Sequence, residues 1–214
     1  MRITASIPAA CLLVGLAGCA ASRDAHAPSG AARGRGAIHT EDVRSLAIRR
    51  VEPMSSTPIQ VRSPAFEPGG EIPYKYSDYG EKSSPELNLG DIPAGTQTLV
   101  LLMEDPDAPI KPFVHWVLFN VPPNRTHLRE AMPGEMRLRD LGDANQGLNT
   151  RGSVGYFGMR PPYEDPAHHY HFQVFALDRK LDLAPGAERD TVLAAMRGHV
   201  LASGEVVGTY RAAK

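Results

Sequence analysis

Short runs of apolar residues, separated by Pro, Gly, Asn and Asp, fill the chain from about residue 46 onward. This pattern is typical of a β-rich domain rather than a helical one. Residues 98–103 are nearly all apolar, so they predict a strand buried on both faces. Residues 113–119 predict a second strand, and residues 170–177 predict a third. No internal repeat is visible, so we expect one mainly β domain over residues 46–214.

The two-residue period of a strand assigns side chains to its faces. In the second predicted strand, one face would carry Phe113, His115, Val117 and Phe119, and the other Val114, Trp116 and Leu118. His115 is therefore expected to project from an apolar face. If the third strand begins at His168, then His168 and Tyr170 share one side, opposite His169 and His171.

Few helices are expected. Residues 124–132 can form a short helix that Pro133-Gly134 would end, and residues 190–201 predict a better one. In the second helix Asp190 could act as the N-terminal cap. Its apolar positions at helical spacing predict contact with the core rather than a ligand site; they are Val192, Leu193, Met196 and Val200.

The N-terminus has the features of an export signal. Arg2 precedes an apolar run over residues 7–16, which is too short to span a membrane. The run ends in Leu16-Ala17-Gly18-Cys19, which resembles the lipobox of bacterial lipoproteins. That resemblance implies a signal peptide over residues 1–18, a lipid on Cys19 and a periplasm-facing place in the cell envelope. The alternative is an ordinary signal cut near Ala21, with Cys19 lost.

Residues 19–45 are rich in Ala, Gly, Ser and Arg without apolar periodicity, so they are expected to form a flexible, lipid-anchored tether. Cleavage would leave 196 of the 214 residues, enough for one domain with a substantial core. The only cysteines are Cys11 and Cys19, so the mature chain could form no internal disulfide. With 23 basic and 24 acidic residues the charge is nearly balanced, which argues against a nucleic-acid partner.

The candidate chemistry begins directly after the first predicted strand, at Asp105-Pro106-Asp107-Ala108-Pro109. The two prolines restrict the loop that presents Asp105. His115, His168 and Tyr170 supply imidazole and phenol donors from distant segments, and such donors can converge on a small anion. An ionised Asp105 would repel that anion, so we expect it to orient a histidine and favour its charged form, or to meet the amine of a zwitterionic head group.

These segments together resemble the phosphatidylethanolamine-binding protein family. The resemblance rests on five blocks in order, at residues 105–109, 115–120, 155–162, 168–170 and 172–177. The closing stretches at residues 198–202 and 207–210 are similar to the bacterial branch of the family, often called Raf-kinase-inhibitor-like. The resemblance implies a β-sandwich with a few short peripheral helices, including a C-terminal one, and one small anion pocket near the surface.

Carried over by position, the family's pocket maps onto Asp105, His115, His168 and Tyr170, with Tyr156 and Gly158 in its wall. Relatives usually carry a small residue before the paired prolines, whereas this chain has Met159-Arg160. Arg160 could clamp a phosphate, narrow the entrance or point to solvent. Each residue also has a structural interpretation: Asp105 as a turn former, His115 as a core histidine, His168 as a loop residue and Tyr170 as a strand aromatic.

Two function classes remain open. The first is a non-enzymatic binding or regulatory envelope lipoprotein that takes a phosphate-bearing small molecule or phospholipid head group, with inhibition of a kinase or protease as a candidate role. It would need no cofactor and no metal. The second is a hydrolase or metal-dependent enzyme that uses the same Asp, His, His and Tyr side chains. Against the second, the sequence has no nucleophile elbow, no zinc-binding histidine pair with a glutamate and no phosphate-binding glycine loop.

Overall fold

The computed structural model describes residues 43–110 and 112–213. The expected signal peptide (1–18), the lipidation site Cys19 and nearly all of the expected tether (19–45) lie outside the described residues. In the part of the chain that is described, none of the helices combines the length and apolar character needed to cross a bilayer.

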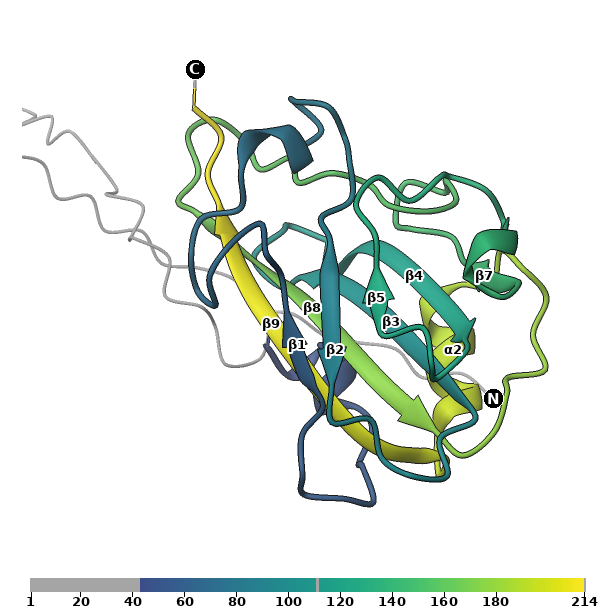
Figure 1. Cartoon of the computed structure of the whole chain (residues 1–214). Helices are drawn as coiled ribbons and strands as arrows, with labels where there is room; N and C mark the ends of the chain where they lie inside the picture. The colour runs from purple at the N-terminus through teal and green to yellow at the C-terminus, as the bar shows by residue number, and fades with distance from the viewer. Residues whose placement is uncertain (1–42, 111, 214) are drawn as a thin grey trace, which may run out of the picture. The chain divides into compact units, whose positions relative to one another are not determined.

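Two antiparallel sheets make up the domain (Figure 1). The smaller has the order β1-β2-β5, with β1 at Gln60–Arg62, β2 at Leu87–Gly90 and β5 at His127–Leu128. The larger has the order β6-β7-β4-β3-β8-β9. Its strands are β6 (Arg137–Leu138), β7 (Ala144–Gln146), β4 (Phe113–Val121), β3 (Thr98–Asp105), β8 (His168–Leu177) and β9 (Val200–Tyr210). The helical elements are α2 (Arg189–Met196) and the short 3-10 helices η1 (Ala47–Arg49), η2 (Tyr74–Tyr76) and η3 (Arg139–Leu141). The expectation of a mainly β fold with few helices is confirmed.

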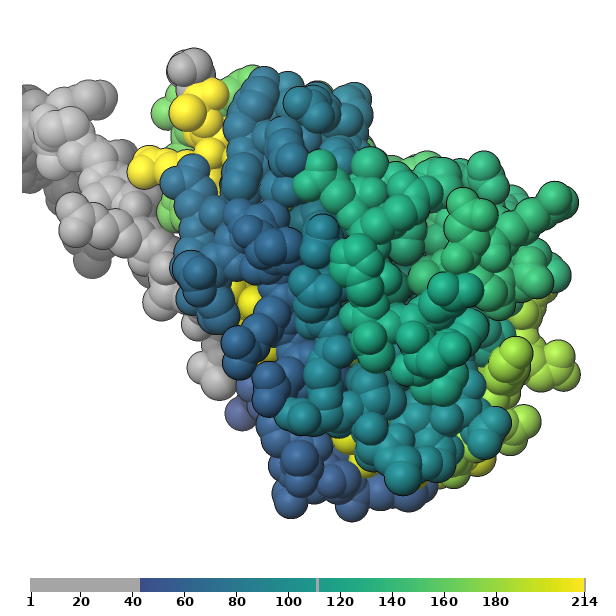
Figure 2. Space-filling view, viewed as in Figure 1, coloured from purple at the N-terminus to yellow at the C-terminus, as the bar shows by residue number. Residues whose placement is uncertain are grey.

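The larger sheet is buried on both faces, which explains the unbroken apolar run in β3. One face of β3 carries Leu99, Leu101 and Met103 into a core shared with Leu87 and Leu128 of the smaller sheet. The other face packs Val100 and Leu102 against residues of α2, including Val192, Leu193 and Met196. In Figure 2 the segment from β1 to β2, in blue, and the segment around β5 to β7, in green, cover the near face.

Both helix predictions need correction. The expected helix at residues 124–132 is wrong: a turn ends at Arg125, and β5 follows, pairing with β2. Burial of Leu128 in the core and the ladder to β2 outweigh the local helical preference. The C-terminal helix ends at Met196 rather than 201, and Glu188 rather than Asp190 is its N-cap. Gly198, with φ of 75°, turns the chain into β9.

A β-bulge in β4 overturns the predicted faces of this strand. Met103 pairs with Trp116 and Glu104 pairs with Val114, so His115 is an extra residue with no partner in β3. Val114 consequently packs with Val117 and Phe119, while Trp116 lies in the core between the sheets. The His115 ring contacts Tyr170, a member of that same core. The bulge thus turns His115 to the Trp116 side of the sheet, away from Val117 and Phe119.

A buried ion pair ties the start of the described chain to the larger sheet. Glu104 is fully buried and accepts hydrogen bonds from the Ala47 N–H (2.7 Å), the Gln173 side chain (2.7 Å) and the Arg189 guanidinium. Arg189 also donates to the Ser45 carbonyl. These bonds fix residues 45–47 against β3, β8 and α2, so the packed domain includes Ser45, which the sequence had assigned to the tether.

Candidate functional site

Asp105 uses its two carboxylate oxygens for different tasks. Oδ1 accepts the N–H groups of Asp107 (2.8 Å) and Ala108 (3.1 Å), which closes the turn after β3. Oδ2 accepts a hydrogen bond from Nδ1 of His168 at 2.9 Å. Asp105 is only 3% exposed. Asp105 is therefore both a turn former and the residue that orients a histidine, because the turn fixes the carboxylate whose other oxygen meets His168.

β8 brings His168 and Tyr170 to the same side, as the strand period predicted, with rings 6.4 Å apart. Burial of His168 opposes its charged form, but the hydrogen bond that the ring donates to Asp105 and the negative charge of that carboxylate outweigh this, so the pKa of His168 is raised above its usual value. On the other side of β8, His169 pairs with Asp107 and His171 with Glu205.

His115 meets the same group from β4. Its ring lies edge-on to Tyr170, with centroids 5.2 Å apart, and its Nδ1 donates to the Phe157 carbonyl at 2.7 Å. Because a carbonyl can only accept, the neutral ring carries its proton on Nδ1 and has a free lone pair on Nε2. Burial lowers the pKa of His115 despite the nearby charge of Asp105. The neutral ring must therefore take up a proton before Nε2 can donate to an anion.

The Tyr170 hydroxyl completes the group as a buried polar atom without a partner. Tyr170 is fully buried, and among the described residues no acceptor meets its hydroxyl in good hydrogen-bond geometry, although the carboxylate of Asp105 lies near it. Burial and the negative charge of Asp105 raise the pKa of this phenol, so the hydroxyl keeps its proton. A neutral hydroxyl is a hydrogen-bond donor, and a buried donor without a partner is costly unless a ligand or water meets it.

In the turn at residues 156–160, Tyr156 and Gly158 do not have the place in the cavity wall that the family resemblance implied. Tyr156 points into the fold, where its hydroxyl donates to the Tyr76 carbonyl at 2.7 Å and its ring packs edge-on to Trp116. Gly158 allows a close backbone approach, since a Cβ there would stand 2.5 Å from the Asp78 nitrogen. Both residues hold the turn, but neither lines the cavity that the histidines border.

Arg160 does line that cavity. Its guanidinium pairs with Asp78 at 2.9 Å and lies over the Tyr79 ring, while about half of the side chain stays exposed. The sequence left three alternatives open for Arg160; the structure places its half-exposed side chain in the lining of the cavity, and a contact between Arg160 and phosphate stays a prediction. Asp78 and Tyr79 hold the side chain in place without covering it.

The cavity has a volume of about 240 Å³. Four of the expected residues line it: Asp105, His115, Arg160 and His168. Sequence reasoning missed Phe113, Phe157 and Arg151, which also line it. Arg151 lies over the rings of Phe113 and Phe157, and the Thr150 hydroxyl, which accepts the Val114 N–H, ties its loop to β4. Arg151 falls outside every predicted element, so no sequence signal pointed to it.

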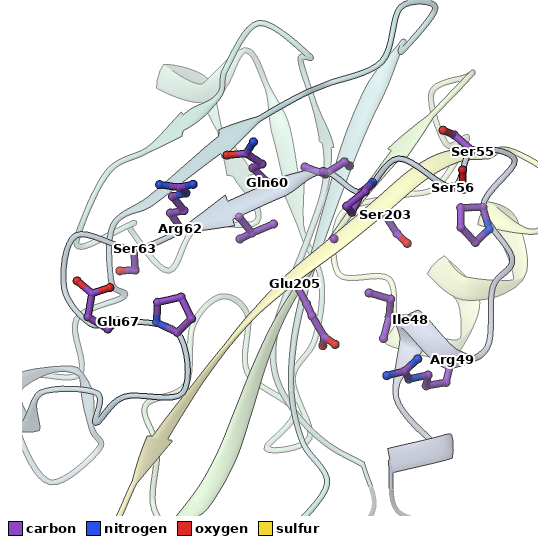
Figure 3. Close-up of a pocket in the computed structure, with 16 residues that line it drawn as sticks. Ile48, Arg49, Ser55, Ser56, Gln60, Arg62, Ser63, Glu67, Ser203 and Glu205 are labelled. Carbon is purple, nitrogen blue, oxygen red and sulfur yellow. The ribbon is translucent and has the colours of Figure 1, made fainter.

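A larger cavity of about 870 Å³ lies elsewhere, where the segment before β1 crosses β9 (Figure 3). Its charged residues balance, with Arg49 and Arg62 opposed by Glu67 and Glu205. It contains no histidine or tyrosine, so its size alone does not make it the better candidate. Within residues 43–110 and 112–213, no three His, Cys, Asp or Glu side chains are grouped so that they could hold a metal ion.

The fold and the site define a class: two packed β-sheets with a small cavity bordered by a buried Asp–His pair. The chain belongs to the phosphatidylethanolamine-binding protein family, because the family model described as Phosphatidylethanolamine-binding protein matches residues 62–211. This confirms the resemblance noted in the sequence. The described cavity residues all fall within the matched range.

Individual relatives agree with this assignment. A UPF0098 protein of Methanothermobacter thermautotrophicus is 43% identical over 153 residues, which cover 72% of this chain and 99% of the relative. One from Aquifex aeolicus is 40% identical, covering 72% and 88%. Among solved structures, a phosphatidylethanolamine-binding protein homologue from Chlamydia trachomatis is 38% identical with a TM-score of 0.66, covering 73% of this chain and 99% of that one. YbcL of Escherichia coli is 28% identical with a TM-score of 0.65 and the same coverage.

Proposed function

We propose that this chain is a non-enzymatic binding protein whose 240 Å³ cavity takes a phosphate-type anion, free or carried by a small molecule or a phospholipid head group. The observation that carries the proposal is that His115 and the Asp105–His168 pair border the cavity, with the Tyr170 hydroxyl buried beside them and not part of its lining. Oxygens of an anion in the cavity could accept hydrogen bonds from the two protonated imidazoles of its lining, His115 and His168.

The rim of the cavity supports the same assignment. Arg151 and Arg160 add two guanidinium groups, which match the geometry of phosphate oxygens. Among the lining residues that the structure describes there is no Ser, Thr or Cys to act as a nucleophile, so the Asp105–His168 pair has no hydroxyl or thiol to activate. We therefore prefer binding to hydrolysis. Inhibition of a kinase or protease would follow if the cavity took an anionic group of that partner, and free phosphate would then relieve it.

Anion affinity should depend on pH. An anion stabilises the charged forms of His115 and His168, so the complex binds more protons than the free protein, and affinity rises as pH falls. Titration calorimetry with inorganic phosphate and with sulfate should show affinity increasing from about pH 8 to about pH 6, by up to about tenfold per pH unit for each histidine that takes up a proton. Sulfate is included because its own charge does not change in this range.

The His168→Gln variant serves as the matched control, because it keeps a hydrogen-bonding side chain but cannot become charged. Its pH dependence should be weaker than that of the wild type, with only His115 left to take up a proton. If sulfate affinity proved independent of pH in the wild type, the two histidines would not be ligands of the anion, and the proposal would fail.

The proposal includes an envelope location, with the domain anchored by a lipid on Cys19. It rests on the lipobox-like Leu16-Ala17-Gly18-Cys19. Replacing Cys19 by Ser should move the protein from the membrane fraction to the soluble fraction of its cells, because the residue that carries the lipid is lost. Cell fractionation followed by immunoblotting measures this. An unchanged distribution would contradict lipid anchoring while leaving the anion cavity unaffected.

A further inference from the structure

Four arginines line a separate cavity of about 690 Å³ that is formed by residues of β5, β6 and η3. They are Arg125, Arg129, Arg137 and Arg139. This cavity shares no lining residue with the one that contains Asp105 and the two histidines. It is therefore a distinct site, with chemistry that the proposed function does not use.

The local sequence explains why the arginines gather there. In β5 Leu128 is buried in the core while His127 is exposed, and Arg125 and Arg129 lie two residues to either side of His127. The alternation repeats in β6, where Leu138 is buried between the exposed Arg137 and Arg139. Each leucine anchors its segment in the core between the sheets, so the alternate positions are left in solvent.

Carboxylates in the lining balance only half of these charges, and they form no ion pair with the arginines among the described residues. Among the residues that the structure describes, the guanidinium groups of Arg125, Arg137 and Arg139 have no ion pair and no hydrogen bond, and that of Arg129 donates only to backbone carbonyls. Glu135 and Asp140 also line the cavity, leaving two of the four positive charges unbalanced. His127, which also lines the cavity, pairs with Glu86. Several guanidinium groups without ion pairs around one cavity favour an anion whose oxygens can accept hydrogen bonds from more than one of them.

The cavity is also larger than a bare phosphate needs, and part of its lining is apolar, with Met132, Leu138 and Leu141 beside the arginines. We propose that this arginine cavity binds an organic phosphate ester, with the phosphate held by guanidinium groups and the organic part against the apolar lining. Such an ester could be a soluble phosphomonoester or the head group of an anionic phospholipid.

Titration of the full-length protein with hexyl phosphate tests the proposal. The wild type should show a binding event that is weakened about tenfold or more in the Arg137→Gln/Arg139→Gln variant, on the scale of losing charge-assisted hydrogen bonds. The matched control is Arg49→Gln/Arg62→Gln, which removes two exposed arginines at the cavity in Figure 3 and should leave that event unchanged. The His168→Gln variant should also retain it, which separates this site from the proposed anion cavity.

Sedimentation with phosphatidylglycerol vesicles, against phosphatidylcholine vesicles, distinguishes the source of the ester; every variant carries Cys19→Ser here, so that the proposed lipid anchor does not itself hold the protein on the vesicles. If the Arg137→Gln/Arg139→Gln variant loses vesicle binding that Arg49→Gln/Arg62→Gln retains, the lipid head group is the ligand form. If the Arg137→Gln/Arg139→Gln variant loses binding of hexyl phosphate but still binds the vesicles, the ligand is a soluble phosphate ester. The proposal is overturned if neither probe distinguishes this variant from the wild type, or if the control variant loses binding to the same extent, since net charge would then explain the effect.

Discussion

Replacing Glu104 by Gln is expected to lower the free energy of unfolding by about 3 to 5 kcal/mol, the range found when one partner of a buried ion pair is removed. Glu104 is fully buried, and the guanidinium of Arg189 would be left in the interior without its main counter-charge. Urea denaturation measures the loss. Hydrogen exchange at the Ala47 amide, which donates to Glu104, should become faster because the docking of residues 45–47 weakens.

Asp190→Asn is the matched control for this change. Asp190 pairs with the same arginine but is 86% exposed, so its removal should change stability by no more than about 1 kcal/mol. If the two variants lost similar stability, the buried position of Glu104 would not be the cause. Slow exchange at Ala47 in the Glu104→Gln variant would show that the N-terminal segment is held by other contacts.

Replacing Gly158 by Ala is expected to cost about 1 to 3 kcal/mol, the usual range for overpacking. The added Cβ would stand 2.5 Å from the Asp78 nitrogen and 2.6 Å from the Ser77 carbonyl carbon, and these backbone atoms cannot move without shifting the turn after η2. That turn also carries the Asp78 carboxylate, which holds Arg160. Phosphate affinity should therefore fall together with thermal stability, as measured by calorimetry of both.

Gly134→Ala provides the comparison. A Cβ at Gly134 would meet only the Val154 carbonyl, at an ordinary 3.6 Å, so stability should change by less than about 0.5 kcal/mol. If Gly158→Ala had the same stability as the wild type, the backbone of residues 77–78 would have room to move away from residue 158, and the overpacking argument would be wrong. A destabilised variant with unchanged phosphate affinity would separate the turn from the cavity.

Much of the candidate site could be placed from the sequence. The strand period put His168 and Tyr170 on one side of β8, where they lie together with Asp105 and His115. The family resemblance supplied the grouping, since nothing in the spacing of these segments shows that β3, β4 and β8 are neighbours. Tyr156 and Gly158 were placed at the cavity, yet they stabilise the turn behind it. Arg151 was missed because its loop has no periodicity.

The errors in the fold have a common cause. Residues 124–132 have a local preference for helix, but Leu128 is buried against Leu87 and the other residues of the core between the sheets, a contact between distant segments. The faces of β4 were misassigned because a bulge depends on the pairing with β3, which adds one residue, His115, opposite a gap in its partner. The buried ion pair of Glu104 could not be predicted either. In the sequence Glu104 is a polar residue at the end of an apolar strand, and its partner Arg189 lies 85 residues away.

The sequence by itself determined the β-rich class, the doubly buried strand before Asp105 and the pairing of His168 with Tyr170 on one face. These features depend on local periodicity and composition, which each segment carries alone. Only the tertiary structure decided which side His115 takes, which oxygen of Asp105 orients His168, and that Tyr170 keeps an unsatisfied hydroxyl. The physical reason is that hydrogen bonding, burial and charge at the site come from residues that are distant in the chain and meet only on folding.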